Sequence, residues 1–208
     1  NEGAARFFSG IFGILCALLI FFMGRRLDYT FSAALIAALA FLTLPLVMAS
    51  GRILTTDIFQ LFFFLVAMDG FIRLRFHRQP RGVWHFWIGL GLAGMAKGPI
   101  GLLLALGIIV PFLLWEKDLK WIRNLVRPVP VLVFIVLAFW WPVYIFLTVP
   151  GSFDYLVVKQ MLSRVSEGGF GHPKPIYYYF LYFPLSMLPW IPFITVEIVA
   201  AIRHHDLP

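Results

Sequence analysis

Long apolar runs separated by short polar segments dominate the chain. The runs occupy residues 7–23, 30–48, 58–72, 84–96, 100–115, 129–149 and 176–202. A helix needs roughly 20 apolar residues, within a range of about 17–25, to cross the hydrocarbon core of a bilayer. The first, second, sixth and seventh runs are long enough, the third needs its flanks, and the fourth and fifth are short. This pattern predicts an all-α integral membrane protein with about seven transmembrane helices.

The fourth and fifth runs raise the question of one crossing or two. Together they extend over residues 84–115, which is too long for a single span at about 1.5 Å per residue. Lys97, Gly98 and Pro99 separate them. Proline removes a helix hydrogen bond and glycine permits a turn. We therefore predict a helical hairpin that turns at these three residues.

The basic residues support two crossings there. With seven crossings, 11 of the 17 Lys and Arg residues fall on one side, which the positive-inside rule makes cytoplasmic. A single crossing would move the cluster at 117–127 outside and remove the asymmetry. The chain is thus expected to begin outside, to end inside, and to carry one long external loop at 150–175. The cytoplasmic set is Arg25, Arg26, Arg73, Arg75, Arg78, Arg81, Lys117, Lys120, Arg123, Arg127 and Arg203.

Composition agrees with lipid as the surroundings. Hydrophobic residues make up 61% of the 208 residues and charged residues 13%, with a mean hydropathy of +0.89. Soluble proteins average about 45–50% apolar and about 25% charged. The net charge of +7 comes from clusters between apolar runs, so we expect membrane lipids and no nucleic acid as partners. Because the chain opens at Asn1 and stops just after an apolar run, we expect one transmembrane domain over 1–208 that is a piece of a longer protein.

Few charges are expected on the external side, and two of them follow helix-breaking signals. Asp57 ends a Leu-Thr-Thr-Asp sequence before a Phe-rich run, where a cap of the next helix is the simple interpretation. Lys97 stands at the break of the predicted hairpin, where its ammonium group either faces a cavity at the membrane surface or is an ordinary interfacial cation. Within the runs, Asp69 is expected to pair with Arg73 at i+4, and Glu197 with Arg203.

The long external loop carries further candidates. Arg164 and Lys174 supply charge-assisted donors for a phosphate group. Arg6, near the first run, is by itself a snorkelling anchor at the interface. His172 is a candidate for binding a metal or the acceptor, although a surface histidine is the simpler interpretation. A solvated connector is the alternative for the whole loop. The sequence contains no Walker A, HExxH or CxxC motif, so a divalent metal cofactor has no support from a motif.

Short motifs in a fixed order carry a family resemblance. The chain resembles the lipid-dependent GT-C glycosyltransferases, in particular the bacterial aminoarabinose transferases of lipid A and the protein O-mannosyltransferase-like enzymes. The resemblance covers nearly the whole chain. The matching stretches are Asn1-Glu2-Gly3-Ala4-Ala5-Arg6, Gly24-Arg25-Arg26-Leu27, Leu54-Thr55-Thr56-Asp57, Gly89-Leu90-Gly91-Leu92-Ala93, Lys97-Gly98-Pro99-Ile100-Gly101, Trp141-Pro142-Val143-Tyr144, Arg164 to His172-Pro173-Lys174-Pro175, Tyr177-Tyr178-Tyr179 and Leu188-Pro189-Trp190.

The resemblance implies a GT-C bundle that moves a sugar from a polyprenyl-phosphate donor to lipid A, a glycan or a protein at the outer face of the bacterial inner membrane. Asp57 would then support catalysis, with the family's main catalytic acid expected before Asn1. The resemblance further implies that the family's first membrane helix, first external loop and C-terminal part lie outside residues 1–208, so we expect this piece to be inactive alone. Lys97, Arg164, Arg6 and Lys174 would bind the donor phosphate.

One departure from the family argues against a loop metal and against lipid A as the acceptor. Gln160-Met161 stands where the lipid A enzymes tend to have Glu-His. A transporter or flippase of an amphipathic lipid, with a discontinuous helix at the membrane midplane, is the alternative function. A non-catalytic membrane scaffold is the third.

Overall fold

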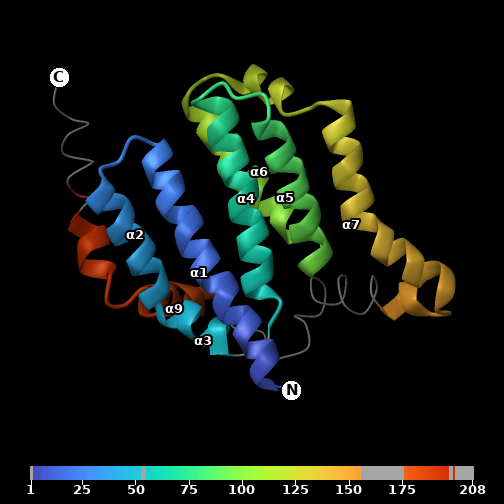
Figure 1. Cartoon of the computed structure of the whole chain (residues 1–208), viewed down its shortest axis with the longest axis horizontal. Coiled ribbons are helices and arrows are strands. Elements are labelled where there is room, and N and C mark those ends of the chain that lie inside the picture. The colour runs from blue at the N-terminus through green and yellow to red at the C-terminus, as the bar shows by residue number, and fades with distance from the viewer. Residues whose placement is uncertain (1, 53–54, 156–175, 197–198, 200–208) are drawn as a thin grey trace.

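The computed structural model describes residues 2–52, 55–155, 176–196 and 199 of the chain, and every regular element in these ranges is helical (Figure 1). The predicted all-α class is therefore confirmed for the described part. The elements are α1 (Glu2–Arg26), α2 (Phe31–Thr43), α3 (Pro45–Arg52), α4 (Asp57–Arg75), α5 (Gly82–Lys97), α6 (Ile100–Trp115), the 3₁₀ helix η1 (Leu119–Asn124), α7 (Pro128–Thr148) and α9 (Ile176–Ser186).

The long helices lie side by side in the order α2, α1, α4, α5 and α7, with α6 behind α4 and α5 (Figure 1). Helix α2 runs antiparallel to α1 and α4 antiparallel to α5, whereas α1 is parallel to α4 and α5 is parallel to α7 (Figure 1). The end of the bundle where α1 and α4 finish also holds the start of α5, the segment η1 and the start of α7. We call it the basic end. The opposite end holds the start of α4 and the end of α5.

Close approach of α4 and α5 forms the centre of the bundle. A Cβ atom added at Gly89 would lie 2.7 Å from the Ala67 amide nitrogen and 2.7 Å from the Phe63 carbonyl oxygen. Glycine is therefore required here for the two backbones to pack at this distance. Buried apolar side chains from α4, α5 and α6 fill the adjoining core, among them Phe71, Phe86, Leu90, Ile109 and Leu113.

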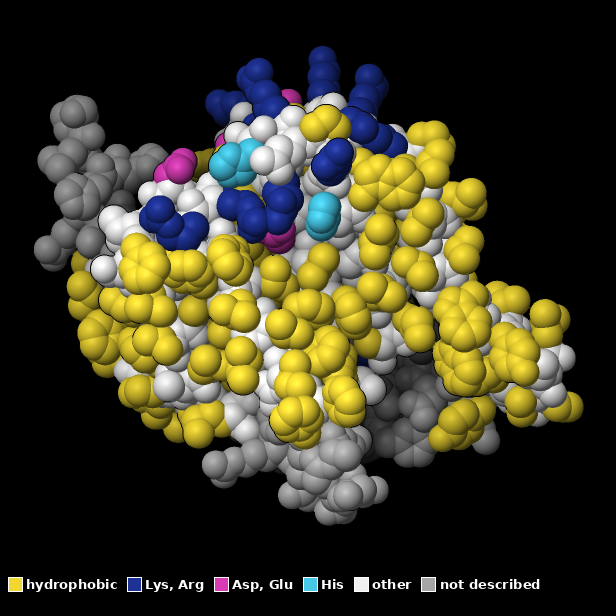
Figure 2. Space-filling model, viewed as in Figure 1, with side chains coloured by type: hydrophobic (Ala, Val, Ile, Leu, Met, Phe, Trp, Pro, Cys, Tyr) yellow, Lys and Arg dark blue, Asp and Glu magenta, His cyan; other side chains and the backbone are white. Residues whose placement is uncertain are grey.

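The outer surface of the bundle is apolar. Large hydrophobic side chains cover its sides, whereas Lys and Arg gather at the basic end (Figure 2). Two described helices have the length and composition of a membrane span, Phe7–Arg26 with a mean hydropathy of 2.4 and Pro128–Thr148 with 2.3. Only 6% of the most apolar part of α7 is buried, so its sides are available to lipid. The count of seven crossings stays a prediction.

Two predicted spans are divided in the structure. The second run breaks at Leu44, which is extended (φ −64°, ψ 129°) because Pro45 follows it, so α2 has 13 residues and α3 runs separately. The seventh run is not one helix either, since α9 ends at Ser186 and turns occupy 187–190 before a second helical segment at 191–196. The sixth run agrees with α7, which extends over Pro128–Thr148.

The predicted hairpin is confirmed. Helix α5 ends at Lys97 and α6 begins at Ile100. Gly98 adopts φ 77° and ψ −156°, a conformation that is open almost only to glycine, and its amide donates to the Gly94 carbonyl at 2.7 Å. This turn therefore fixes where α5 ends, and with it the position of Lys97.

Candidate functional site

Buried and half-buried ion pairs hold the basic end together. Asp69 is only 3% exposed and binds two arginines, Arg26 from α1 and Arg73 from α4, the latter with 2.6 Å between Nε and Oδ2. Arg75 binds Glu116 and, at 3.1 Å, Asp118 beyond the end of α6. The predicted i+4 pair is confirmed, whereas the contact with Arg26, 43 residues away, was missed. These carboxylates are engaged in packing the helices, which makes them poor candidates for chemistry.

At the opposite end the structure brings together two of the predicted site residues. The Asp57 carboxylate and the Lys97 ammonium group form an ion pair. Asp57 is the first residue of α4 and Lys97 the last of α5, and the two helices are antiparallel neighbours. The side chains are 48% and 40% exposed, so both charged groups are open to a ligand. We call this arrangement the Asp57–Lys97 pair.

The helix ends explain why these two charges are stable where they are. An acidic side chain is favoured in the first turn of a helix and a basic one in the last, because of the helix dipole. Asp57 and Lys97 occupy those positions in α4 and α5. The simple interpretation of Asp57 as the cap of α4 is wrong in position, because Thr56 is the N-cap residue and makes no capping hydrogen bond with its side chain, while Asp57 is the first helical residue. Asp57 itself turns to Lys97 instead.

Polar side chains near the starts of α1 and α4 add to this end of the bundle. Ser9, Thr55 and Gln60 each have a buried side-chain atom without a hydrogen-bond partner among the described residues. Ser9 is 1% and Gln60 8% exposed. An unpaired buried polar group is costly, so these atoms are candidates for contact with a polar ligand. Sequence analysis missed them, although Gln60 stands out as the polar residue within a Phe-rich run.

The other predicted site residues lie where the structure gives no side-chain geometry. Arg164, His172 and Lys174 fall outside the described residues, and so does Glu197. Arg6 belongs to α1, but its side chain is not described. Within the described ranges, no group of three His, Cys, Asp or Glu side chains comes together in a way suited to a metal ion. The donor-phosphate role of Arg6, Arg164 and Lys174 and the metal or acceptor role of His172 therefore stay predictions.

Comparison with known proteins identifies the family. Residues 1–201 match the family described as dolichyl-phosphate-mannose-protein mannosyltransferase. The chain belongs to this family. The predicted resemblance to GT-C glycosyltransferases is therefore confirmed. The Asp57–Lys97 pair lies at one end of this mannosyltransferase-family bundle. No solved structure matches the chain.

Relatives of this mannosyltransferase-family chain include bacterial sugar transferases. An undecaprenyl phosphate-alpha-4-amino-4-deoxy-L-arabinose arabinosyl transferase of Aeromonas hydrophila is 28% identical over 194 residues, which cover 90% of this chain and 35% of the relative. The protein of the same name from Erwinia tasmaniensis is 27% identical over 195 residues, which cover 92% of this chain and 35% of the relative. An uncharacterized protein of Aquifex aeolicus is 24% identical over 190 residues, which cover 91% of this chain and 37% of that protein. The chain spans about a third of the length of these curated relatives.

Proposed function

We propose that the whole protein is a membrane glycosyltransferase that takes a sugar from a polyprenyl-phosphate donor and works at the end of the bundle that holds the Asp57–Lys97 pair. Family membership and relatives named for undecaprenyl phosphate-linked aminoarabinose support the reaction class. The observation that carries the placement is the exposed ion pair itself, in which a cation and a carboxylate meet at one end of the bundle.

The reaction needs both kinds of charge. An oxygen of the acceptor forms a bond to the anomeric carbon, while the bond from that carbon to the phosphate oxygen breaks. The phosphate leaves with the bonding electrons as polyprenyl phosphate, and a hydroxyl acceptor gives its proton to a carboxylate. A cation placed beside the leaving oxygen stabilises the charge that develops there. A carboxylate that accepts a hydrogen bond from the acceptor orients it and receives its proton.

The Asp57–Lys97 pair fits these two requirements. We assign the phosphate contact to Lys97 and a supporting contact with the acceptor to Asp57, whose carboxylate also holds the ammonium group in place. Arg6, Arg164 and Lys174 are proposed to complete the phosphate site, and His172 to contact the acceptor. The acceptor is proposed to be lipid A, a glycan or a protein, at the outer face of a bacterial inner membrane.

The depth of the pair supports a transferase over a transporter. Transporters place discontinuous helices and their substrate sites near the membrane midplane. Here the break at Gly98 separates two complete helices at the end of the bundle, and Lys97 lies beside the first residue of α4. Substrate at this position meets one face of the membrane, as transfer to an external acceptor requires.

Binding of undecaprenyl phosphate to the whole protein in detergent tests the proposal. Lys97→Ala is expected to weaken binding at least tenfold, which corresponds to about 1.4 kcal/mol. Lys120→Ala is the matched control, because Lys120 is an exposed lysine at the basic end and should leave binding unchanged. Asp57→Asn should retain the phosphate affinity within about threefold and lower sugar transfer at least tenfold. Equal effects of Lys97→Ala and Lys120→Ala would contradict this assignment of the donor site.

A further inference from the structure

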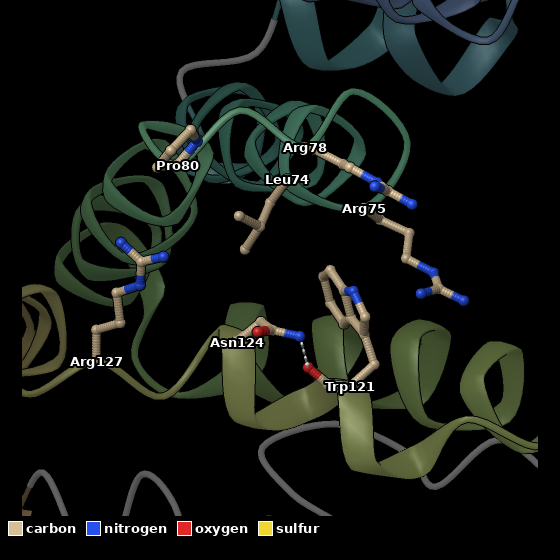
Figure 3. Close-up of a pocket in the computed structure, with 7 residues that line it drawn as sticks. All are labelled: Leu74, Arg75, Arg78, Pro80, Trp121, Asn124 and Arg127. Atoms are coloured by element: carbon tan, nitrogen blue, oxygen red, sulfur yellow. Dashed lines mark hydrogen bonds between the residues drawn. The ribbon is translucent and has the colours of Figure 1, made fainter.

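A second candidate site lies at the basic end, away from the Asp57–Lys97 pair. The end of α4 with the loop after it and the 3₁₀ helix η1 line a half-open cavity of about 410 Å³. Ligand sites in proteins usually measure about 300–1,000 Å³. Three arginines, an asparagine and a tryptophan line most of the cavity, with Leu74 and Pro80 (Figure 3). Its basic walls and its size favour a small anionic group.

The arginines stand on two sides of the cavity. Figure 3 shows Arg127 on one side and Arg75 with Arg78 on the other, with Leu74, Trp121 and Asn124 between them. Asn124 is held by a hydrogen bond from its amide to the Trp121 carbonyl at 3.0 Å. Arginine residues therefore stand on both sides of the cavity, and the Arg75 and Arg78 side chains extend away from Arg127 in this view.

The charge of these arginines is not equally available. Arg75 is engaged by Glu116 and Asp118 and lies over the Trp121 ring at 5.1 Å, so it serves as a wall of the cavity. Arg78 and Arg127 are exposed, and neither has an ion-pair partner among the described residues. The cavity thus has two uncompensated guanidinium groups, and a phosphate group would provide the charge-assisted acceptor that both lack.

The position of the cavity beside α7 favours a lipid as the source of that phosphate. Arg127 directly precedes α7, one of the two helices long and apolar enough to cross a bilayer. Val129 and Leu132 on the first turns of α7 are 57% and 60% exposed, so an apolar surface continues from the cavity along the helix. Headgroups lie at this level beside a membrane span, and basic pockets between transmembrane helices bind anionic lipid headgroups.

We propose that this cavity binds the phosphate headgroup of an anionic phospholipid from the leaflet at the basic end, with Arg78 and Arg127 as its ligands and the acyl chains along α7. The site is separate from the proposed transferase site, and its failure would leave the function of the Asp57–Lys97 pair untouched. The bound lipid would link the loop after α4 to the start of α7, two segments that the described ion pairs leave unconnected.

Native mass spectrometry of the whole protein, titrated with phosphatidylglycerol or phosphatidylcholine in detergent, tests the proposal. Phosphatidylglycerol should bind the wild type at least tenfold more tightly than phosphatidylcholine. The double variant Arg78→Gln/Arg127→Gln should lose this preference. The matched double variant Lys120→Gln/Arg123→Gln removes two exposed cations of the same end that do not line the cavity, and should retain the preference within about threefold.

A second variant guards against misfolding as the explanation. Arg78 has φ 53°, in the left-handed region that glycine adopts without strain, so Arg78→Gly is expected to fold at least as well as the wild type while binding phosphatidylglycerol more weakly. If this variant binds phosphatidylglycerol more weakly but keeps its stability, the loss of binding comes from the missing Arg78 charge and not from misfolding. Equal losses in both double variants, or no loss in either, would overturn the proposal. Binding of inorganic phosphate in place of the lipid, with displacement of phosphatidylglycerol, would overturn the lipid source and assign a soluble anion.

Discussion

Substitution of Gly89 by alanine tests whether close contact of α4 and α5 holds the bundle together. The added Cβ would lie 2.7 Å from two backbone atoms of α4, the Ala67 nitrogen and the Phe63 oxygen. Ordinary contacts of a Cβ atom begin at 3.4 Å. Because both neighbours are backbone atoms, no side-chain rotation relieves the clash, and the helices must separate by about 0.7 Å at this level.

The size of the effect follows from a matched comparison. Overpacking of a well-packed core costs about 1–3 kcal/mol. Replacing glycine by alanine within a helix also gains up to about 1 kcal/mol in helix propensity, which would mask part of that cost. Gly107→Ala in α6 has the same gain without the clash, because a Cβ there meets nothing within 4 Å. The difference between the two variants should therefore equal the packing cost, about 1–3 kcal/mol.

Unfolding by sodium dodecyl sulfate in mixed micelles, followed by far-ultraviolet circular dichroism, measures this difference. Gly89→Ala should unfold at a lower mole fraction of the denaturing detergent than Gly107→Ala. Because α4 and α5 also position Asp57 against Lys97, Gly89→Ala should weaken undecaprenyl phosphate binding as well. If the two alanine variants unfold together, the close contact does not stabilise the bundle and the reasoning fails.

Three further outcomes are expected in the same unfolding assay. Asp69→Asn should lower the free energy of unfolding by about 3 kcal/mol or more, because it leaves two arginines without their buried carboxylate, whereas exposed Arg25→Gln should change it by less than about 0.5 kcal/mol. Gly98→Ala should cost about 2 kcal/mol from its backbone conformation alone, since a Cβ there meets no atom. Asp57→Asn should change the free energy of unfolding by less than about 1 kcal/mol, because its pair with Lys97 is half exposed. A loss of sugar transfer by this variant would therefore reflect a role of Asp57 in the reaction and not unfolding.

The features that sequence analysis predicted depend on neighbouring residues. The helical hairpin follows from Gly98 and Pro99, and the pair of Asp69 with Arg73 follows from a spacing of four residues on one helix. The placement of Asp57 and Lys97 at the same end also follows from the order of crossings, since one begins a run and the other ends the next. Local signals and simple topology therefore gave the location of the candidate site.

Contacts between helices far apart in sequence could not be predicted in the same way. Arg26 and Asp69 are 43 residues apart, and only packing of α1 on α4 brings them together. The break of the second apolar run at Pro45 was missed because hydropathy continues across it, although the proline removes a backbone donor. The cavity at the basic end could not be predicted, because the positive-inside rule already accounts for its arginines as residues of the cytoplasmic side.

The same residue type has different consequences at the basic end depending on whether a carboxylate accompanies it. Arg26 and Arg73 share the buried Asp69 and so join α1 to α4. Arg78 and Arg127 have no such partner among the described residues and line a cavity next to the start of α7. Topology requires an excess of cations at this end, but it does not require them to line one cavity. Two guanidinium groups without a carboxylate partner at one cavity beside α7 are therefore the feature that calls for an anionic ligand.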